Sequence, residues 1–257
     1  MQWQFTAGIV LANQCIDKDI WQLIIECPEI AAKCKPGNFI MLRAWNNEAY
    51  LPRPMAVYKH DQVCLEVVYR IKGLGTELLA AAPPGSAIRL MGPLGAAVTH
   101  AFAGKRIALV GRGVGITPLL AVAQAAAEQG AASITTFLSA RQPSLVLGKE
   151  EFGQWGTVYI QTDEQDSAMI TETLAKLLSA GQKFDYIYLS GSNRLVRHCQ
   201  ALAKTYAFHA FVFLEARMAC GIGYCKGCAV EIKSEQHKYS LCCKEGPLYA
   251  VEDVVLN

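Results

Sequence analysis

The stretch that decides the fold is Arg106-Ile107-Ala108-Leu109-Val110-Gly111-Arg112-Gly113-Val114-Gly115-Ile116-Thr117-Pro118. The apolar run before the first glycine is typical of a buried strand, and Pro118 suits the first turn of a helix. A glycine-rich turn between strand and helix lets the backbone approach a diphosphate, and the helix start supplies amide donors. We therefore predict a nucleotide-binding loop at Gly111, Gly113, Gly115 and Pro118, with a purely structural turn as the alternative.

Strands and helices alternate on the carboxyl side of this stretch. The pattern predicts helices over residues 118–129, 170–178 and 194–204, and strands over 134–138, 158–160, 186–189 and 211–214. Such alternation indicates a parallel sheet with helices on both faces.

The amino-terminal side looks different. Short runs rich in branched and aromatic residues at 8–11, 21–25, 39–42 and 63–68 are separated by proline and glycine turns, which predicts an antiparallel barrel or sandwich. After Glu215 the periodicity ends. We therefore divide the chain into a β-barrel domain (1–98), an α/β domain (99–215) and a small carboxyl-terminal module (216–257).

The composition excludes several classes of protein. Of 257 residues, 52% are hydrophobic and 18% charged, and the net charge is +2. Disorder is excluded, and nucleic acid is not expected as a partner because that role needs a clustered basic surface. No apolar run approaches the roughly 18 residues of a membrane-spanning helix, and the amino terminus lacks the features of a signal peptide. We expect a cytoplasmic protein with no membrane partner.

Five of the ten cysteines crowd near the carboxyl end: Cys220, Cys225, Cys228, Cys242 and Cys243. The spacing C-x4-C-x2-C followed by a distant cysteine is that of plant-type [2Fe–2S] proteins. Intervening glycines allow the loop to bend around a cluster. Cys242 and Cys243 compete as the fourth ligand. A four-cysteine zinc site and a metal-free segment are the alternatives.

Weaker motifs lie elsewhere. The arginine of Arg53-Pro54-Met55-Ala56 offers a planar fork suited to phosphate, although a surface arginine at a strand entry is the alternative. Two glycine motifs, at 73–76 and 92–95, carry little weight alone. The five histidines show no ligand spacing and are predicted to be structural.

In order along the chain, these segments resemble the ferredoxin reductase superfamily. More closely, they are similar to the electron-transfer subunits of class 1B dihydroorotate dehydrogenases. The most specific likeness is Glu215-Ala216-Arg217-Met218-Ala219-Cys220-Gly221-Ile222-Gly223. Others are Pro36–Phe39, Tyr69-Arg70, Gly73–Thr76 and Gly92–Gly95.

The resemblance implies an FAD-binding β-barrel, an NAD-binding α/β domain and a [2Fe–2S] module. It assigns FAD binding to nine positions: Arg53, Pro54, Met55, Ala56, Val68, Tyr69, Arg70, Gly75 and Thr76. It assigns the cluster to Cys220, Cys225, Cys228 and Cys243, because Cys243-Lys244-Glu245-Gly246-Pro247 matches the family's Cys-x-x-Gly-Pro. Cys242 is then a bystander.

The resemblance also implies a function in pyrimidine biosynthesis. A flavin-containing catalytic partner oxidises dihydroorotate, and electrons pass singly through the cluster to FAD, which reduces NAD+. The chain is then an oxidoreductase subunit in a hetero-oligomer, a heterotetramer, without catalytic residues of its own.

Three departures from the family pattern lie in one functional region. The family's Arg-Pro-x-Ser ends in Ala56, its Cys-Gly-Pro reads Ser190-Gly191-Ser192, and its acidic-Gly-Ser reads Glu164-Gln165-Asp166-Ser167. These changes suggest the hypothesis that FAD and cluster are kept while pyridine-nucleotide use, or the partner, is altered.

Two other functions stay open. One is an electron-transfer subunit of another redox complex, linked to NAD(P) and ferredoxin or to a hydrogenase. The other is a non-enzymatic iron–sulfur or zinc module. Arg141 could meet the 2′-phosphate of NADP or face solvent, so NAD and NADP are not distinguished.

Overall fold

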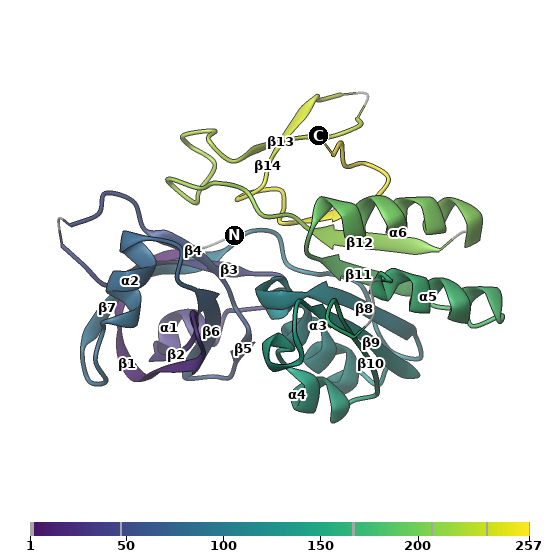
Figure 1. Ribbon diagram of the computed structural model, residues 1–257. Coiled ribbons are helices and arrows are strands. Elements are labelled where there is room, and N and C mark those ends of the chain that lie inside the picture. Colours follow the sequence, from purple (N-terminus) through teal and green to yellow (C-terminus); the bar gives the residue numbers. More distant parts are fainter. Residues whose placement is uncertain (1–2, 47, 166–167, 207, 235, 257) are drawn as a thin grey trace.

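The computed structural model describes residues 3–46, 48–165, 168–206, 208–234 and 236–256 (Figure 1). Within these ranges no helix is long and apolar enough to cross a membrane.

A curled antiparallel sheet forms the amino-terminal part. Its strands lie in the order β4-β3-β7-β1-β2-β6-β5, and the curl brings β4 close to β6. The bounds are β1 (Gln4–Asp17), β2 (Ile20–Glu26), β3 (Phe39–Arg43), β4 (Arg53–Ala56), β5 (Lys59–His60), β6 (Cys64–Arg70) and β7 (Ala87–Leu94), with the helices α1 (Pro28–Ala31) and α2 (Leu74–Ala80). Arg53, predicted to precede a strand, is the first residue of β4.

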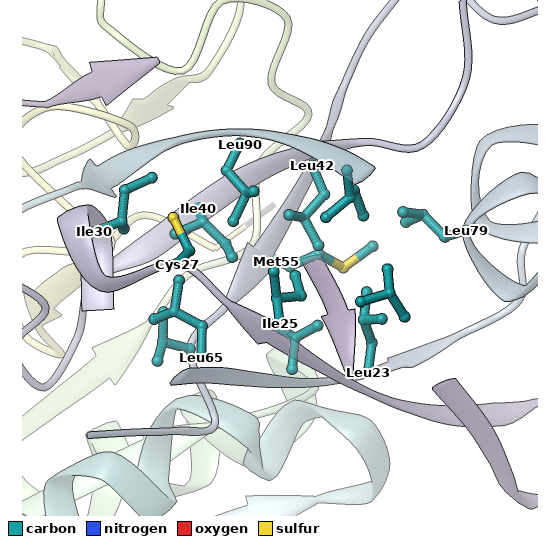
Figure 2. Close-up of a cluster of buried hydrophobic side chains, with 14 of the residues drawn as sticks. Leu23, Ile25, Cys27, Ile30, Ile40, Leu42, Met55, Leu65, Leu79 and Leu90 are labelled. Atoms are coloured by element: carbon teal, nitrogen blue, oxygen red, sulfur yellow. The ribbon is translucent and has the colours of Figure 1, made fainter. Parts of the chain in front are cut away.

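Alternate residues of these strands fill the interior of the curl. Leu23 and Ile25 of β2, Ile40 and Leu42 of β3 and Leu90 of β7 are buried together (Figure 2). The intervening residues point outward because successive side chains of a strand face opposite sides. The outer face of β3 and β7 is apolar as well, and the carboxyl-terminal segment covers it.

The second sheet has the order β10-β9-β8-β11-β12-β15. Its strands are β8 (Arg106–Arg112), β9 (Ser133–Ala140), β10 (Thr157–Thr162), β11 (Tyr186–Ser190), β12 (His209–Phe213) and β15 (Leu248–Ala250). The helices are η1 (Gly113–Ile116), α3 (Thr117–Glu128), η2 (Pro143–Leu145), α4 (Lys149–Gly153), α5 (Ile170–Ser179) and α6 (Asn193–Tyr206). The first five strands are parallel, and separate apolar cores form on the two faces, one against α3 and one against α5 and α6.

The expectation of an all-parallel sheet is corrected at its edge. Strand β15 comes from the carboxyl-terminal segment and pairs antiparallel with β12. The same segment forms the small hairpin of β13 (Ala229–Glu231) and β14 (Tyr239–Leu241). The α/β domain and the carboxyl-terminal module, which the proposed boundary at residue 215 separates, are therefore joined by the hydrogen bonds between β12 and β15.

An ion pair at the start of β8 predicts a pH-dependent contribution to stability. Asp185 accepts hydrogen bonds from the backbone N–H of Arg106 at 2.8 Å and from its Nε at 3.0 Å. The hydrogen bonds from Arg106 lower the pKa of Asp185 from 3.8 to about 2. A carboxylate with a depressed folded-state pKa stabilises the protein above its unfolded pKa and loses this contribution as the pH falls through the folded value.

We therefore expect Asp185→Asn to lower the free energy of unfolding near neutral pH. The difference from wild type should shrink as the pH falls from about 4 towards about 2. Urea unfolding over this range measures it. A difference that does not change with pH would show that the ionised carboxylate is not what stabilises the site.

Candidate functional site

A cleft of about 900 Å³ lies between the two sheets. It is bordered by β4, β6 and the start of α2 on one side, and by η1 and the carboxyl ends of β11 and β12 on the other. Eleven of the thirteen residues predicted to bind FAD or nucleotide line it: Arg53, Pro54, Met55, Ala56, Val68, Tyr69, Arg70, Thr76, Gly113, Gly115 and Pro118. The other two, Gly75 and Gly111, are buried and do not line the cleft.

The Arg53 side chain is held at the cleft by its own loop. One guanidinium nitrogen, Nη1, donates to the carbonyl of Leu51 at 2.6 Å, and the guanidinium lies 5.4 Å from the ring centre of Trp45. Trp45 is buried and is itself fixed by a hydrogen bond to Ala49. The guanidinium fork is therefore oriented before any anion binds, which is the arrangement that suits phosphate recognition.

Gly75 acts through Arg53. A Cβ at position 75 would lie 2.4 Å from the Arg53 guanidinium carbon and from two of its nitrogens. The absence of a side chain at this position therefore leaves room for the guanidinium. The Thr76 hydroxyl, next in sequence, accepts from the N–H of Lys72 and Gly73 and donates to the Gly73 carbonyl. Its hydrogen bonds shape the loop that lines the cleft.

We expect Gly75→Ala to displace the Arg53 guanidinium without unfolding the chain, because the clashing atoms are the end of a flexible side chain. The amount of flavin retained on purification should fall. Gly153→Ala is the control, since a Cβ there has no other atom within 4 Å. Equal flavin content in the two variants would contradict this role of Gly75.

Two further side chains complete this wall. The Tyr69 hydroxyl donates to Asn13 at 3.3 Å, and burial raises the Tyr69 pKa, so this side chain is a neutral hydrogen-bonding group. Arg70 Nε lies 3.2 Å from a carboxylate oxygen of Asp19. Arg53 and Arg70 thus place two cations on the same wall of the cleft.

Each of the three glycines in the glycine loop is required for a different structural reason. Gly113 has φ of +55° and no atom near its missing Cβ, so it gives the turn and leaves the backbone open to the cleft. A Cβ at Gly111 would meet Ile116 at 2.7 Å, so this glycine allows strand and helix to pack. A Cβ at Gly115 would lie 3.3 Å from Gly191, where two loops approach.

Two of the three departures from the family pattern meet in this cleft, whereas Glu164 and Gln165 of the third do not line it. Ala56 lines one wall, and Ser190, Gly191 and Ser192 line the other, near Gly115. Arg141 also lines the cleft. Asp166 and Ser167 lie outside the described residues.

The cysteine loop brings the predicted ligands together. Gly221 and Gly223, with φ of +72° and +81°, bend the chain after Cys220. The N–H of Gly223 donates to the Cys243 sulfur at 3.0 Å, across 20 residues. The N–H of Cys225 donates to the Cys220 sulfur at 3.4 Å. Backbone amides pointing at sulfur are the environment that stabilises thiolate ligands of an iron–sulfur cluster.

The ionisation of these thiols fits a cationic centre. Burial acts to raise the pKa of Cys220. Hydrogen bonds from the N–H groups of Cys225, Ile222 and Tyr224 outweigh this effect and lower the pKa to about 7. The sulfurs of Cys228 and Cys243 lie 3.1 Å apart, and burial together with Cys228 raises the pKa of Cys243 to about 12. Two such close, buried thiols can both ionise only beside positive charge, which the irons of a cluster supply.

The structure separates Cys243 from its neighbour. Cys242 is fully buried, and its thiol donates to the Leu214 carbonyl at 3.4 Å. In the described part of the chain, no three His, Cys, Asp or Glu side chains converge tightly enough to hold a single metal ion.

Comparison with known proteins agrees with this geometry. Residues 215–255 match the family model of the iron–sulfur cluster binding domain of dihydroorotate dehydrogenase B. The electron transfer subunit of dihydroorotate dehydrogenase B (NAD(+)) from Bacillus cereus strain G9842 is 30% identical over 255 residues, covering 96% of this chain and 97% of the relative. The subunit from Enterococcus faecalis strain V583 is 28% identical over 256 residues, with the same coverage.

This chain belongs to the family of dihydroorotate dehydrogenase B electron transfer subunits.

Solved structures place the family in a wider fold group. The NADH-dependent reduced ferredoxin-NADP oxidoreductase superposes with a TM-score of 0.87 at 25% identity, covering 96% of this chain and 89% of that one. Phthalate dioxygenase reductase, at 16% identity and a TM-score of 0.67, shares the fold over 90% of this chain and 87% of its own. The expected ferredoxin reductase-like fold is therefore confirmed.

One pair in this electron transfer subunit was not expected from the sequence. Arg112, inside the glycine loop, donates to both carboxylate oxygens of Asp163, at 3.0 and 2.6 Å. The pKa of Asp163 is lowered. The largest cause is the hydrogen bonding to Arg112, and the positive charges of Arg112, Arg141 and Arg194 lower it further. The pair is exposed and contributes little to stability, but it joins the last residue of β8 to the residue that follows β10.

A thin apolar layer separates the cysteine loop from the cleft. Leu214, Ala216 and Met218 line the cleft and also pack against the cluster of buried residues that contains Cys228 and Cys243.

Proposed function

We propose that this chain links a catalytic dihydroorotate dehydrogenase subunit to NAD+ through a [2Fe–2S] cluster and FAD. The observation that carries the proposal is the shared wall of Leu214, Ala216 and Met218, because these residues line the cleft and also pack against the core that contains Cys228 and Cys243, two of the predicted cluster ligands. Such closeness is needed for electrons to pass between two bound groups. When bound, a cluster carries single electrons and a flavin exchanges between one- and two-electron transfer.

In this proposal FAD binds on the side of the cleft formed by the antiparallel sheet. Arg53 and Arg70 offer charge-assisted hydrogen bonds to its diphosphate. The backbone of the Lys72–Thr76 loop and the half-buried strand ends of β4 and β6 shape the remaining wall. Gly75 contributes because it has no side chain that would clash with the Arg53 guanidinium.

The opposite side of the cleft is proposed to hold the pyridine nucleotide. Gly113 leaves the loop backbone open to the cleft, and Gly115 and Gly191 allow two loops to approach. Ser190 and Ala56 line opposite walls of the cleft, one on the proposed pyridine-nucleotide side and the other on the proposed FAD side.

The convergence of Ala56, Ser190 and Ser192 on one cleft favours a second candidate, in which the chain keeps FAD and cluster but uses the pyridine nucleotide differently. The likeness to an NADH-dependent reduced ferredoxin-NADP oxidoreductase also supports this candidate, since the name of that protein gives ferredoxin and NADP as its reactants besides NADH.

The proposed compartment is the cytoplasm, and the proposed assembly is a hetero-oligomer. Low-pKa cluster thiolates such as Cys220 are oxidised readily when exposed to oxidants, so a reducing compartment suits the site.

Reconstitution tests the function. The chain, loaded with FAD and cluster, is mixed anaerobically with the catalytic subunit, dihydroorotate and NAD+, and NADH formation is followed by absorbance. We expect NADH formation that requires both subunits. If the catalytic subunit oxidises dihydroorotate with an artificial acceptor but no NADH forms with this chain, the proposed function is wrong.

A further inference from the structure

The outer face of β1 carries a run of exposed apolar side chains. Phe5 is 69% exposed, and Ile9 and Leu11 are 42% and 44% exposed. Ala7 is exposed between them, and Trp3, just before the strand, is 43% exposed. We name these residues, Trp3, Phe5, Ala7, Ile9 and Leu11, the β1 face. On the opposite side of the strand Gly8 and Val10 are buried inside the curl, and Gln4 and Thr6 are half-buried.

The β1 face adjoins the surface that the cysteine module covers. In the sheet β1 lies next to β7, and β7 lies next to β3. Phe5 pairs with Met91, and Met91 pairs with Met41. Met41 and Met91 pack against the core that contains Cys228 and Cys243, and a Cβ at Gly221 would lie 2.9 Å from Met41. The module therefore covers the outer faces of β3 and β7 and leaves the β1 face open.

Figure 1 shows the yellow-green carboxyl-terminal segment on the side of the curled sheet where β3 lies. One apolar layer thus runs from beneath the cysteine loop onto open surface. The side chains that flank it on the outer face are basic: Arg89 pairs with Ala7 and with Arg43. The guanidinium of Arg89 donates to the Trp45 carbonyl and to Asn46.

This composition is that of an interaction surface. Monomers rarely leave a contiguous apolar patch of this kind uncovered. Aromatic anchors with arginine at the edge are enriched at protein interfaces and at their energetic hot spots. Arg43 and Arg89 also complement an acidic rim on whatever covers the patch.

We propose that the β1 face docks the catalytic dehydrogenase subunit, which presents an apolar surface with an acidic edge. The inference rests on the proposed function. The occupant follows from position: electrons must enter or leave through the cysteine loop, whose turn at Tyr224 and Cys225 is exposed. A partner that reaches this loop contacts the apolar layer continuous with it. A second copy of this chain has no such reason to lie beside the cluster.

The test compares two isoleucine variants of similar exposure. Ile9→Glu places a charge on the β1 face. Ile160→Glu makes the same change at a 38% exposed site on β10, in the other sheet. Binding of the FAD- and cluster-loaded chain to the catalytic subunit is measured by sedimentation. We expect roughly 30-fold weaker binding for Ile9→Glu, as for a hot-spot residue, and wild-type binding for Ile160→Glu.

Phe5→Ser is the second variant, and the flavin and iron content of each protein shows that the fold is kept. If Ile9→Glu and Phe5→Ser bind as wild type, or if Ile160→Glu is weakened equally, the inference is wrong. If both β1 variants abolish self-association of the chain while partner binding is kept, the face belongs to a second copy and the inference is also overturned. Failure of the wild-type chain to bind would instead count against the proposed function itself.

Discussion

Cys243→Ser is expected to abolish the iron–sulfur cluster, whereas Cys242→Ser, one residue earlier, is expected to retain it. The Cys243 sulfur accepts the Gly223 amide at 3.0 Å and lies 3.1 Å from the Cys228 sulfur, in the midst of the other ligands. Cys242 instead donates to the Leu214 carbonyl. A serine hydroxyl can make that hydrogen bond, so Cys242→Ser should cost only about 1 kcal/mol of stability.

The measurement is visible absorbance and electron paramagnetic resonance of the dithionite-reduced proteins, with iron content per chain. Cys243→Ser should lose the cluster signals almost completely but keep bound flavin, and electron flow from the catalytic subunit to the flavin should stop. The matched Cys242→Ser protein serves as the control. Loss of the cluster in Cys242→Ser with retention in Cys243→Ser would reverse the ligand assignment.

Arg53→Ala is expected to weaken FAD binding by roughly 1.5–3 kcal/mol, which is about ten- to a hundredfold in affinity, because one charge-assisted hydrogen bond is lost. The side chain is already oriented by Leu51 and Trp45, so little of its binding energy is spent on ordering it.

The affinity is measured by flavin fluorescence during titration of the flavin-free protein. Arg43→Ala is the matched control: Arg43 lies on the neighbouring strand β3, opposite Arg89 rather than at the cleft, and its loss should leave FAD affinity unchanged. Unchanged affinity in Arg53→Ala would remove this residue from the FAD site.

The parts of the site that follow from local pattern were predictable. The C-x4-C-x2-C spacing placed three thiols on one loop, and the strand–glycine–helix pattern placed Gly113 and Gly115 at a cleft, because both motifs are short and their geometry is local. The alternation of strands and helices likewise predicted the parallel strands of the second sheet.

Features that depend on residues distant in sequence were not predictable. The ion pair of Arg112 and Asp163 spans 51 residues, and the antiparallel addition of β15 depends on where the module folds back. Gly75 was predicted to contact the cofactor, yet the Arg53 guanidinium occupies the space beside it. This could not be predicted from the sequence, because only the packed structure shows what a Cβ at position 75 would meet. The full length of β1 was missed because a strand with one buried face normally alternates apolar and polar residues, whereas around Gly8 both the buried and the exposed positions are apolar.

The most direct test of the account is an anaerobic absorbance titration of the loaded chain, first with NADH and then with dithionite. We expect NADH to bleach the flavin bands and then the cluster bands, because the cleft joins the nucleotide loop to Arg53 and lies against the cysteine module. Reduction by dithionite alone, with both groups present, would contradict the role of NAD and would make Ala56, Ser190 and Ser192 the residues that mark a different electron route.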